Sequence, residues 1–202
     1  TPQTDTDFLD DLEKRLLPLH DPSNVAAIMV EPVAGSAGWY VPPADYLKRL
    51  RAICDKHGIL LIFDAVITGF GRLGVGFGAD YFGVVPDMLT FAKCVTNGVI
   101  PLGGVVCRQG VFDAFMQANA SAGEHVIEFF HGYTYSGHPV ACAAAIATLN
   151  LMREENLFAR AGEMGKVLGD AAHAAFKGLP NVVSIRSFGL AAAVEFAPNP
   201  SA

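Results

Sequence analysis

The sequence predicts an α/β protein in which buried strands alternate with amphipathic helices. Two observations carry this prediction. Short, continuous apolar runs at Val25–Val30 and Ile59–Phe63 are typical of strands buried on both faces of a parallel sheet. Between these runs, apolar residues recur at the spacing of one helix face: Tyr46, Leu47, Leu50, Ile53 and Cys54. This alternation favours a mostly parallel sheet flanked by helices.

The first half of the chain begins with an amphipathic helix that extends to about Leu19, since leucines at 9, 12, 16 and 17 share one face. The second helix follows Pro42-Pro43 and ends at His57-Gly58. The strand Ile59–Phe63 is followed directly by Asp64. Residues 68–83 are rich in glycine and aromatic residues, which predicts a structured loop rather than a helix.

The second half continues the alternation. Pro139 suits the first position of a long helix that extends to about Glu155, and Gly178 marks the end of the next one. We expect residues 1–156 to be part of a larger domain and residues 157–202 to begin a small C-terminal α+β domain. The predicted elements of this half are strands at Asp87–Ala92, Gly103–Cys107, Val182–Ile185 and Leu190–Phe196, and helices at Val111–Met116, 139–155 and 157–176.

Composition excludes several classes of function. Of the 202 residues, 51% are hydrophobic and 17% are charged, so the chain can bury a core. A net charge of −6 and the lack of a Lys/Arg run disfavour a nucleic-acid partner, and no apolar run approaches the ~20 residues that a bilayer requires. The four cysteines are widely spaced without a CxxC pair, which favours a reducing, cytoplasmic location. The chain starts at Thr1, so we expect a partial sequence.

Three motifs are better explained without chemistry. Residues 69–74 match GxGxxG, but a dinucleotide site needs a helix directly afterwards, and further glycines follow here. Glu124, His125, Glu128 and His131 alternate with apolar residues without HExxH spacing, so we expect a loop and no metal site. Ser36 lies in Gly-Ser-Ala-Gly, which is not the GxSxG of a nucleophile elbow.

Two charged residues follow buried strands, and these are the candidate functional residues. Asp64 follows the strand Ile59–Phe63, and Lys93 follows the strand Asp87–Ala92. Ligands of open α/β sheets bind outside the carboxyl ends of the strands, so both side chains are expected at one crevice. The alternative is an ordinary ion pair between Asp64 and Lys93 at the edge of the sheet.

Several segments, in order along the chain, resemble the class III aminotransferases, which use pyridoxal 5′-phosphate. Within that family the resemblance is closest to the branch of β-alanine:pyruvate and ω-amino acid aminotransferases. It implies the large domain of fold type I, with the start of the small domain. The segments that carry the resemblance are Val30–Pro32, Asp64–Arg72, Pro86–Lys93, Thr96–Gly98, Pro101–Gly104, His131–Pro139 and Phe188–Leu190.

The resemblance implies roles for four residues. Lys93 would form the Schiff base with the cofactor aldehyde and then shuttle a proton, a role that suits an amine made nucleophilic by desolvation. Asp64 would pair with the pyridine nitrogen, so that the ring accepts electrons. Val66, on the same side of an extended chain as Asp64, would pack against the ring, or it is a core valine. Thr134 would bind the phosphate of the neighbouring subunit's cofactor, or it caps the following helix.

The implied reaction transfers an amino group from an ω-amino acid or amine to pyruvate or another 2-oxo acid, in a homodimer. Two departures stand against it. Ala65 occupies the position where the family usually has Glu, and the family chain is about twice as long. The family's glycine/serine phosphate loop and its arginine for the substrate carboxylate are therefore absent here. The alternatives are another chemistry of the same cofactor, such as an aminomutase or a decarboxylase, and a catalytically silent fragment.

Overall fold

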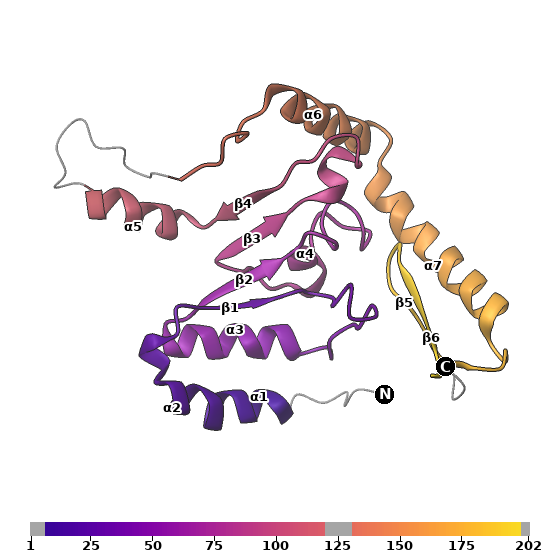
Figure 1. Ribbon diagram of the computed structural model, residues 1–202, viewed down its shortest axis with the longest axis horizontal. Helices are drawn as coiled ribbons and strands as arrows, with labels where there is room; N and C mark the ends of the chain where they lie inside the picture. Colours follow the sequence, from indigo (N-terminus) through magenta and orange to yellow (C-terminus); the bar gives the residue numbers. More distant parts are fainter. Residues whose placement is uncertain (1–6, 120–130, 199–202) are drawn as a thin grey trace.

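The computed structural model describes residues 7–119 and 131–198, and most of its strands form one sheet. Along this sheet the order is β1-β2-β3-β4 (Figure 1). β1, β2 and β3 are parallel, whereas β4 pairs antiparallel with β3. The predicted α/β fold with a mostly parallel sheet is therefore confirmed. The bounds of the four strands are Ala27–Val30, Leu60–Asp64, Met88–Phe91 and Gly104–Cys107.

One face of this sheet packs on helices from the first half of the chain. The N-terminal helical segment consists of α1 (Asp7–Asp11), a π-helical turn η1 (Leu12–Leu16) and α2 (Leu17–His20). α3 (Tyr46–His57) lies between this segment and the sheet (Figure 1). The apolar face that the sequence predicts for α3 is buried in the main core, which consists of Leu9, Leu17, Leu47, Leu50, Ile53, Cys54, Ile59, Leu61, Phe63 and Val84.

The first strand differs from the expectation. β1 pairs with β2 and with no other strand among the described residues, so it forms an edge of the sheet. Met29 is 54% exposed, and the prediction that this strand is buried on both faces was wrong. β2, in contrast, pairs on both sides and its Leu61 and Phe63 are fully buried.

The glycine-rich segment after β2 contains a short helix that the sequence analysis missed. Residues 70–76 fold back on themselves, since the amides of Phe70 and Gly71 donate to the carbonyls of Gly76 and Val75. The chain then forms α4 (Gly78–Phe82), so the prediction of a loop throughout residues 68–83 was wrong at its C-terminal end. The helix does not follow the GxGxxG motif directly, as a dinucleotide site would require.

The last part of the chain forms a second, two-stranded sheet on a long helix. After α5 (Gln109–Asn119) and α6 (Pro139–Glu154), α7 (Leu157–Phe176) packs against the antiparallel pair β5 (Val182–Ser187) and β6 (Ala192–Phe196). Figure 1 shows this unit beside the large sheet. The domain boundary between residues 156 and 157 stays a prediction. None of the described helices is long and apolar enough to span a membrane.

Candidate active site

The two candidate residues lie where β2 and β3 end, at the same end of the sheet. Asp64 is the last residue of β2, and its register partner on β3 is Thr90. Lys93 lies three residues after Thr90, at the start of a 3₁₀ turn, η3 (Lys93–Thr96). Because β2 and β3 are parallel neighbours, the expectation that both residues occupy the same edge is confirmed.

The carboxylate of Asp64 is held through one of its two oxygens. Oδ1 accepts hydrogen bonds from the backbone amide of Val66 (3.0 Å) and from Oγ1 of Thr90 (3.3 Å). Within residues 7–119 and 131–198, no hydrogen bond or ion pair is made by Oδ2. The side chain therefore has a fixed direction and one carboxylate oxygen available for a ligand.

The side chain of Lys93 is exposed and its backbone is unusual. Its φ of 52° lies in the left-handed region, which few residues other than glycine adopt. Lys93 lines an open cavity of about 560 Å³ that is formed by η3 and the segment before β4. The desolvation that the sequence analysis expected for this amine is not provided by the described residues, because the side chain is exposed.

The simplest structural alternative for this pair is not observed. Asp64 and Lys93 form no ion pair with each other in the part of the chain that the structure describes, and Lys93 has no other acidic partner there. An exposed surface pair would have contributed little to stability in any case. Asp64 and Lys93 therefore lie at the carboxyl ends of neighbouring strands without an ion pair between them.

Val66 occupies a turn and not an extended strand. β2 ends at Asp64, and the amide of Gly69 donates to the carbonyl of Ala65 (2.8 Å), which closes the turn. Strand alternation therefore does not determine where Val66 points, and that part of the prediction was wrong. Ala65, which replaces the usual glutamate of the family, is only 1% exposed. A methyl group fits this position without a buried charge.

Thr134 makes no hydrogen bond to Asp64 or Lys93 in the described part of the chain. It is exposed and lies in the turn that precedes α6. α6 begins after His138, which is its N-cap residue and makes no side-chain capping bond, and Thr134 caps no amide among the described residues, so the alternative that Thr134 is a helix cap was wrong. α6 packs against η3, the turn that begins with Lys93. Thr134 therefore precedes a helix that contacts the Lys93 turn.

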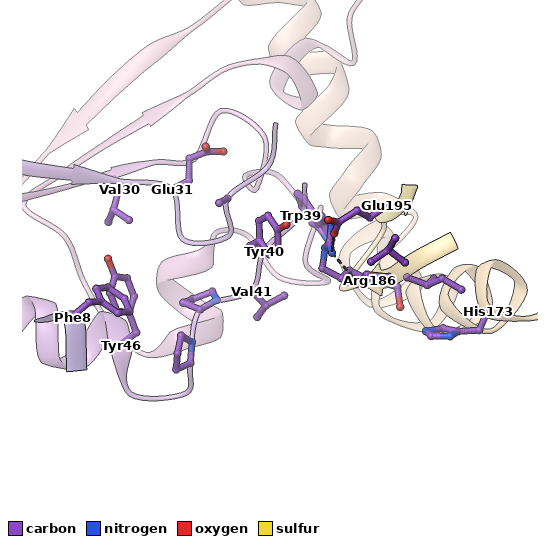
Figure 2. Close-up of a pocket in the computed structure, with 17 residues that line it drawn as sticks. Phe8, Val30, Glu31, Trp39, Tyr40, Val41, Tyr46, His173, Arg186 and Glu195 are labelled. Atoms are coloured by element: carbon purple, nitrogen blue, oxygen red, sulfur yellow. Dashed lines mark hydrogen bonds and ion pairs between the residues drawn. The ribbon is translucent and has the colours of Figure 1, made fainter. Parts of the chain in front are cut away.

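A larger cavity than the one beside Lys93 lies elsewhere. It has a volume of about 1100 Å³ and separates the loop after β1 from the β5–β6 hairpin (Figure 2). Arg186 closes one side: its Nε donates to the carbonyl of Gly38 (2.7 Å), its Nη1 to Glu195 (2.7 Å), and its guanidinium lies over the Tyr40 ring. None of the four predicted site residues lines this cavity.

Two residues near the site were missed by the sequence analysis. Thr90 orients Asp64, and its position opposite the strand-terminal aspartate in the next strand was the available signal. Arg72 donates to Sγ of Cys94, the residue after Lys93.

The prediction that Glu124, His125, Glu128 and His131 form no metal site lies mostly outside the described residues, because residues 120–130 contain the first three of them. The described residues hold no cluster of potential ligands.

Comparison with known proteins agrees with this geometry. The family model of class III aminotransferases matches residues 5–202. The chain is 52% identical over 184 residues to the β-alanine–pyruvate aminotransferase of Pseudomonas aeruginosa. These residues are 91% of this chain and 40% of that protein. The chain is also 51% identical over 201 residues to an ω-aminotransferase of Caulobacter vibrioides, of which it covers 44%. The chain thus spans less than half the length of these relatives.

Solved structures give the same result. The PLP-bound form of an amine transaminase from an uncultivated Pseudomonas species superimposes with a TM-score of 0.85 at 41% identity, over 98% of this chain and 44% of that one. An (S)-enantioselective ω-transaminase from Thermomicrobium roseum gives a TM-score of 0.85 at 38% identity, over 99% and 44%. Both its sequence and its fold therefore show that this chain belongs to the class III aminotransferase family.

Proposed function

We propose that the protein is a pyridoxal 5′-phosphate-dependent aminotransferase, which moves an amino group from an ω-amino acid or amine to pyruvate or another 2-oxo acid. The observation that carries the proposal is the position of Asp64 and Lys93 at adjacent strand ends, without an ion pair between them. The names of the relatives support the substrate class, because β-alanine, ω-amino acids and pyruvate occur among them.

The residues present fit the cofactor. The pyridine nitrogen and the aldehyde group lie on opposite sides of the cofactor ring, so two different side chains are needed to bind them. A carboxylate that binds the nitrogen and an amine that binds the aldehyde cannot at the same time form an ion pair with each other. Asp64 has one carboxylate oxygen without a partner among the described residues, and the amine of Lys93 is exposed. A negative oxygen suits a protonated pyridine nitrogen, and a primary amine suits an aldehyde.

When bound, the cofactor supplies an electron sink for the bond that breaks at the substrate carbon. Asp64, whose carboxylate is held in position by Val66 N–H and the hydroxyl of Thr90, would keep the ring nitrogen protonated. Lys93 Nζ would hold the cofactor at its aldehyde group and would serve as the acid and base that moves a proton at the substrate carbon. Val66 is assigned to the ring face, and the hydroxyl of Thr134 to a phosphate oxygen.

Assembly and location belong to the same proposal. We assign Thr134 to the cofactor of a partner subunit, so the active form is a homodimer with its sites at the subunit interface. The exposure of Thr134 supports this assignment, because its hydroxyl is accessible to a second subunit. All four cysteines are free, which supports a reducing cytoplasmic location.

Chemical trapping of the cofactor tests the proposal. The intact gene product, incubated with pyridoxal 5′-phosphate and reduced with borohydride, is expected to carry a pyridoxyl group on the peptide that contains Lys93. Lys93→Arg should abolish the adduct and the formation of alanine from pyruvate and β-alanine. Lys48→Arg, which changes an exposed lysine of α3, is the matched control and should change neither. An adduct on another lysine would overturn the assignment.

A further inference from the structure

The glycines of the GxGxxG segment bring its backbone against α7. Gly71 and Gly74 have φ angles of 94° and 82°, which residues other than glycine rarely adopt. A Cβ atom at Gly71 would lie 2.7 Å from the Phe158 ring, and one at Gly74 would lie 2.9 Å from Cα of Gly162. The motif that resembles a dinucleotide site therefore has a different use in this fold, which is close packing against the C-terminal unit.

Arg72, inside this motif, is joined to the turn between β5 and β6 by backbone contacts. The amide of Leu190 donates to the carbonyl of Arg72 (2.8 Å). Gly189 has a φ of 57°, and a Cβ atom there would overlap the same carbonyl oxygen. The backbone at Arg72 is therefore fixed against residues 189–190.

The guanidinium of Arg72 extends this connection to the residue that follows Lys93. Nη1 donates to the carbonyl of Leu190 (3.2 Å), and Nη2 donates to Sγ of Cys94 (3.2 Å). A planar guanidinium can satisfy two acceptors in different directions at once, which the single ammonium of a lysine cannot do with the same geometry. One side chain thus joins the Lys93 segment to the β5–β6 turn.

We propose that Arg72 is a positioning residue for Lys93, which acts through Cys94 and fixes the left-handed backbone at the start of η3. Because Lys93 has a φ of 52°, its conformation must be maintained by neighbouring contacts. Arg72, which is itself bonded to Leu190 in the C-terminal unit, supplies such a contact, so the direction of the Lys93 amine depends on how that unit packs. This inference rests on the proposed function, since it gives Arg72 a role in presenting Lys93 to the cofactor.

Hydrogen exchange of the intact, cofactor-free protein is the first test. In Arg72→Lys, the amides of residues 93–97 are expected to exchange about tenfold faster, the effect of losing one hydrogen bond from a charged donor. Cys94→Ala removes the sulfur acceptor but keeps the bond to Leu190, so it should accelerate residues 93–97 and leave residues 187–191 unchanged. Arg186→Lys is the matched control: it weakens another arginine contact of the C-terminal unit and should leave residues 93–97 unchanged.

The absorption spectrum of the bound cofactor is the second test. In Arg72→Lys, the visible band of the lysine-bound cofactor is expected to lose intensity at a fixed cofactor concentration, whereas Arg186→Lys should retain the wild-type band. Unchanged exchange at residues 93–97 in both Arg72→Lys and Cys94→Ala would overturn the inference. Equal acceleration of the whole chain in the Arg72 and Arg186 variants would also overturn it, because that result indicates general loosening. A wild-type protein without an adduct on Lys93 would overturn the proposed function instead, and the exchange comparison would still decide the role of Arg72.

Discussion

Replacing Asp64 by Asn separates the structural role of this side chain from its charge. Both hydrogen bonds that Asp64 accepts, from Val66 N–H and from Thr90 Oγ1, end on Oδ1. The amide oxygen of Asn can accept the same two bonds, so the turn after β2 should stay intact. What changes is the second oxygen, which becomes an NH₂ donor and, in the proposed site, would face the protonated ring nitrogen with the wrong polarity.

The size of the effect follows from the lost charge. Two unit charges ~4 Å apart at an effective dielectric constant of about 20 interact by roughly 4 kcal/mol, which is an upper bound before desolvation. Expressed as a rate, the bound corresponds to roughly a thousandfold. Single-turnover kinetics with β-alanine, in the intact protein with cofactor bound, measure this step directly. We expect a decrease between about tenfold and this bound.

Thr90→Val is the matched control for Asp64→Asn. It removes the hydroxyl that donates to Oδ1 but keeps the carboxylate charge, so we expect a decrease of less than about tenfold, in line with ~1 kcal/mol for a neutral hydrogen bond. If Asp64→Asn reduced the rate by less than about tenfold, roughly 1.4 kcal/mol, Asp64 would not act on the ring nitrogen. If Thr90→Val reduced the rate as much as Asp64→Asn, orientation rather than charge would be decisive.

The other predictions concern stability and the chain itself. Asp87 is 9% exposed and accepts bonds from Arg51 (2.6 Å) and from Leu61 N–H (2.7 Å), so Asp87→Ala should lower the free energy of unfolding by about 3 kcal/mol in urea titrations; a loss below ~1 kcal/mol would contradict this. Burial alone would raise the pKa of Asp87, but the Leu61 amide and Arg51 outweigh burial and lower that pKa. The stability that Asp87 contributes is therefore present above about pH 4 and is lost as the pH falls through the lowered pKa. In Asp87→Ala, the free energy of unfolding should accordingly depend less steeply on pH in the acid range. Gly74→Ala should destabilise more than Gly58→Ala, because both positions have positive φ but only Gly74 faces backbone within 3 Å, and equal thermal shifts would refute the close packing. The 202-residue chain expressed alone should bind pyridoxal 5′-phosphate weakly and form no alanine, because a dianionic phosphate needs several donors; tight binding with turnover in a spectroscopic titration would refute this.

The elements of the sheet could be predicted because periodicity depends on local sequence. The apolar face of α3 and the buried run that became β2 were both located within a few residues. The exposure of Met29 was not predictable, because an apolar run looks the same in an edge strand and in a central one. α4 was missed because its five residues are too few for a periodic pattern and lie among glycines.

The antiparallel direction of β4 has a physical cause that the sequence contains. A parallel crossover needs a connection of about a dozen residues or more, usually with a helix. Residues 92–103 connect β3 to β4, and they form only the 3₁₀ turn η3 and an irregular segment with Gly98 and Pro101, without an α-helix. Without a helix to carry the chain across a face of the sheet, β4 returns beside β3 in the opposite direction.

The candidate site was predictable where it depends on strand ends and not where it depends on distant packing. Asp64 and Lys93 were located from the end of one apolar run each. Thr90 required the register between β2 and β3, and Arg72 required the contact with Leu190, more than a hundred residues later. Neither relation is encoded in local spacing, because it arises only when the strands pair and the C-terminal unit packs.

The backbone of Lys93 shows why such distant contacts matter to the chemistry. A left-handed conformation at a residue other than glycine costs about 1–3 kcal/mol, so surrounding contacts must offset it. Here α6 packs against η3, Thr96 is buried and donates to the carbonyl of Ile100 (2.6 Å), and Arg72 bonds Cys94. Each of these contacts acts on the turn after β3, and none acts on the strand itself. The direction of the Lys93 amine is therefore determined by the packing around η3, which a strand end alone would leave free.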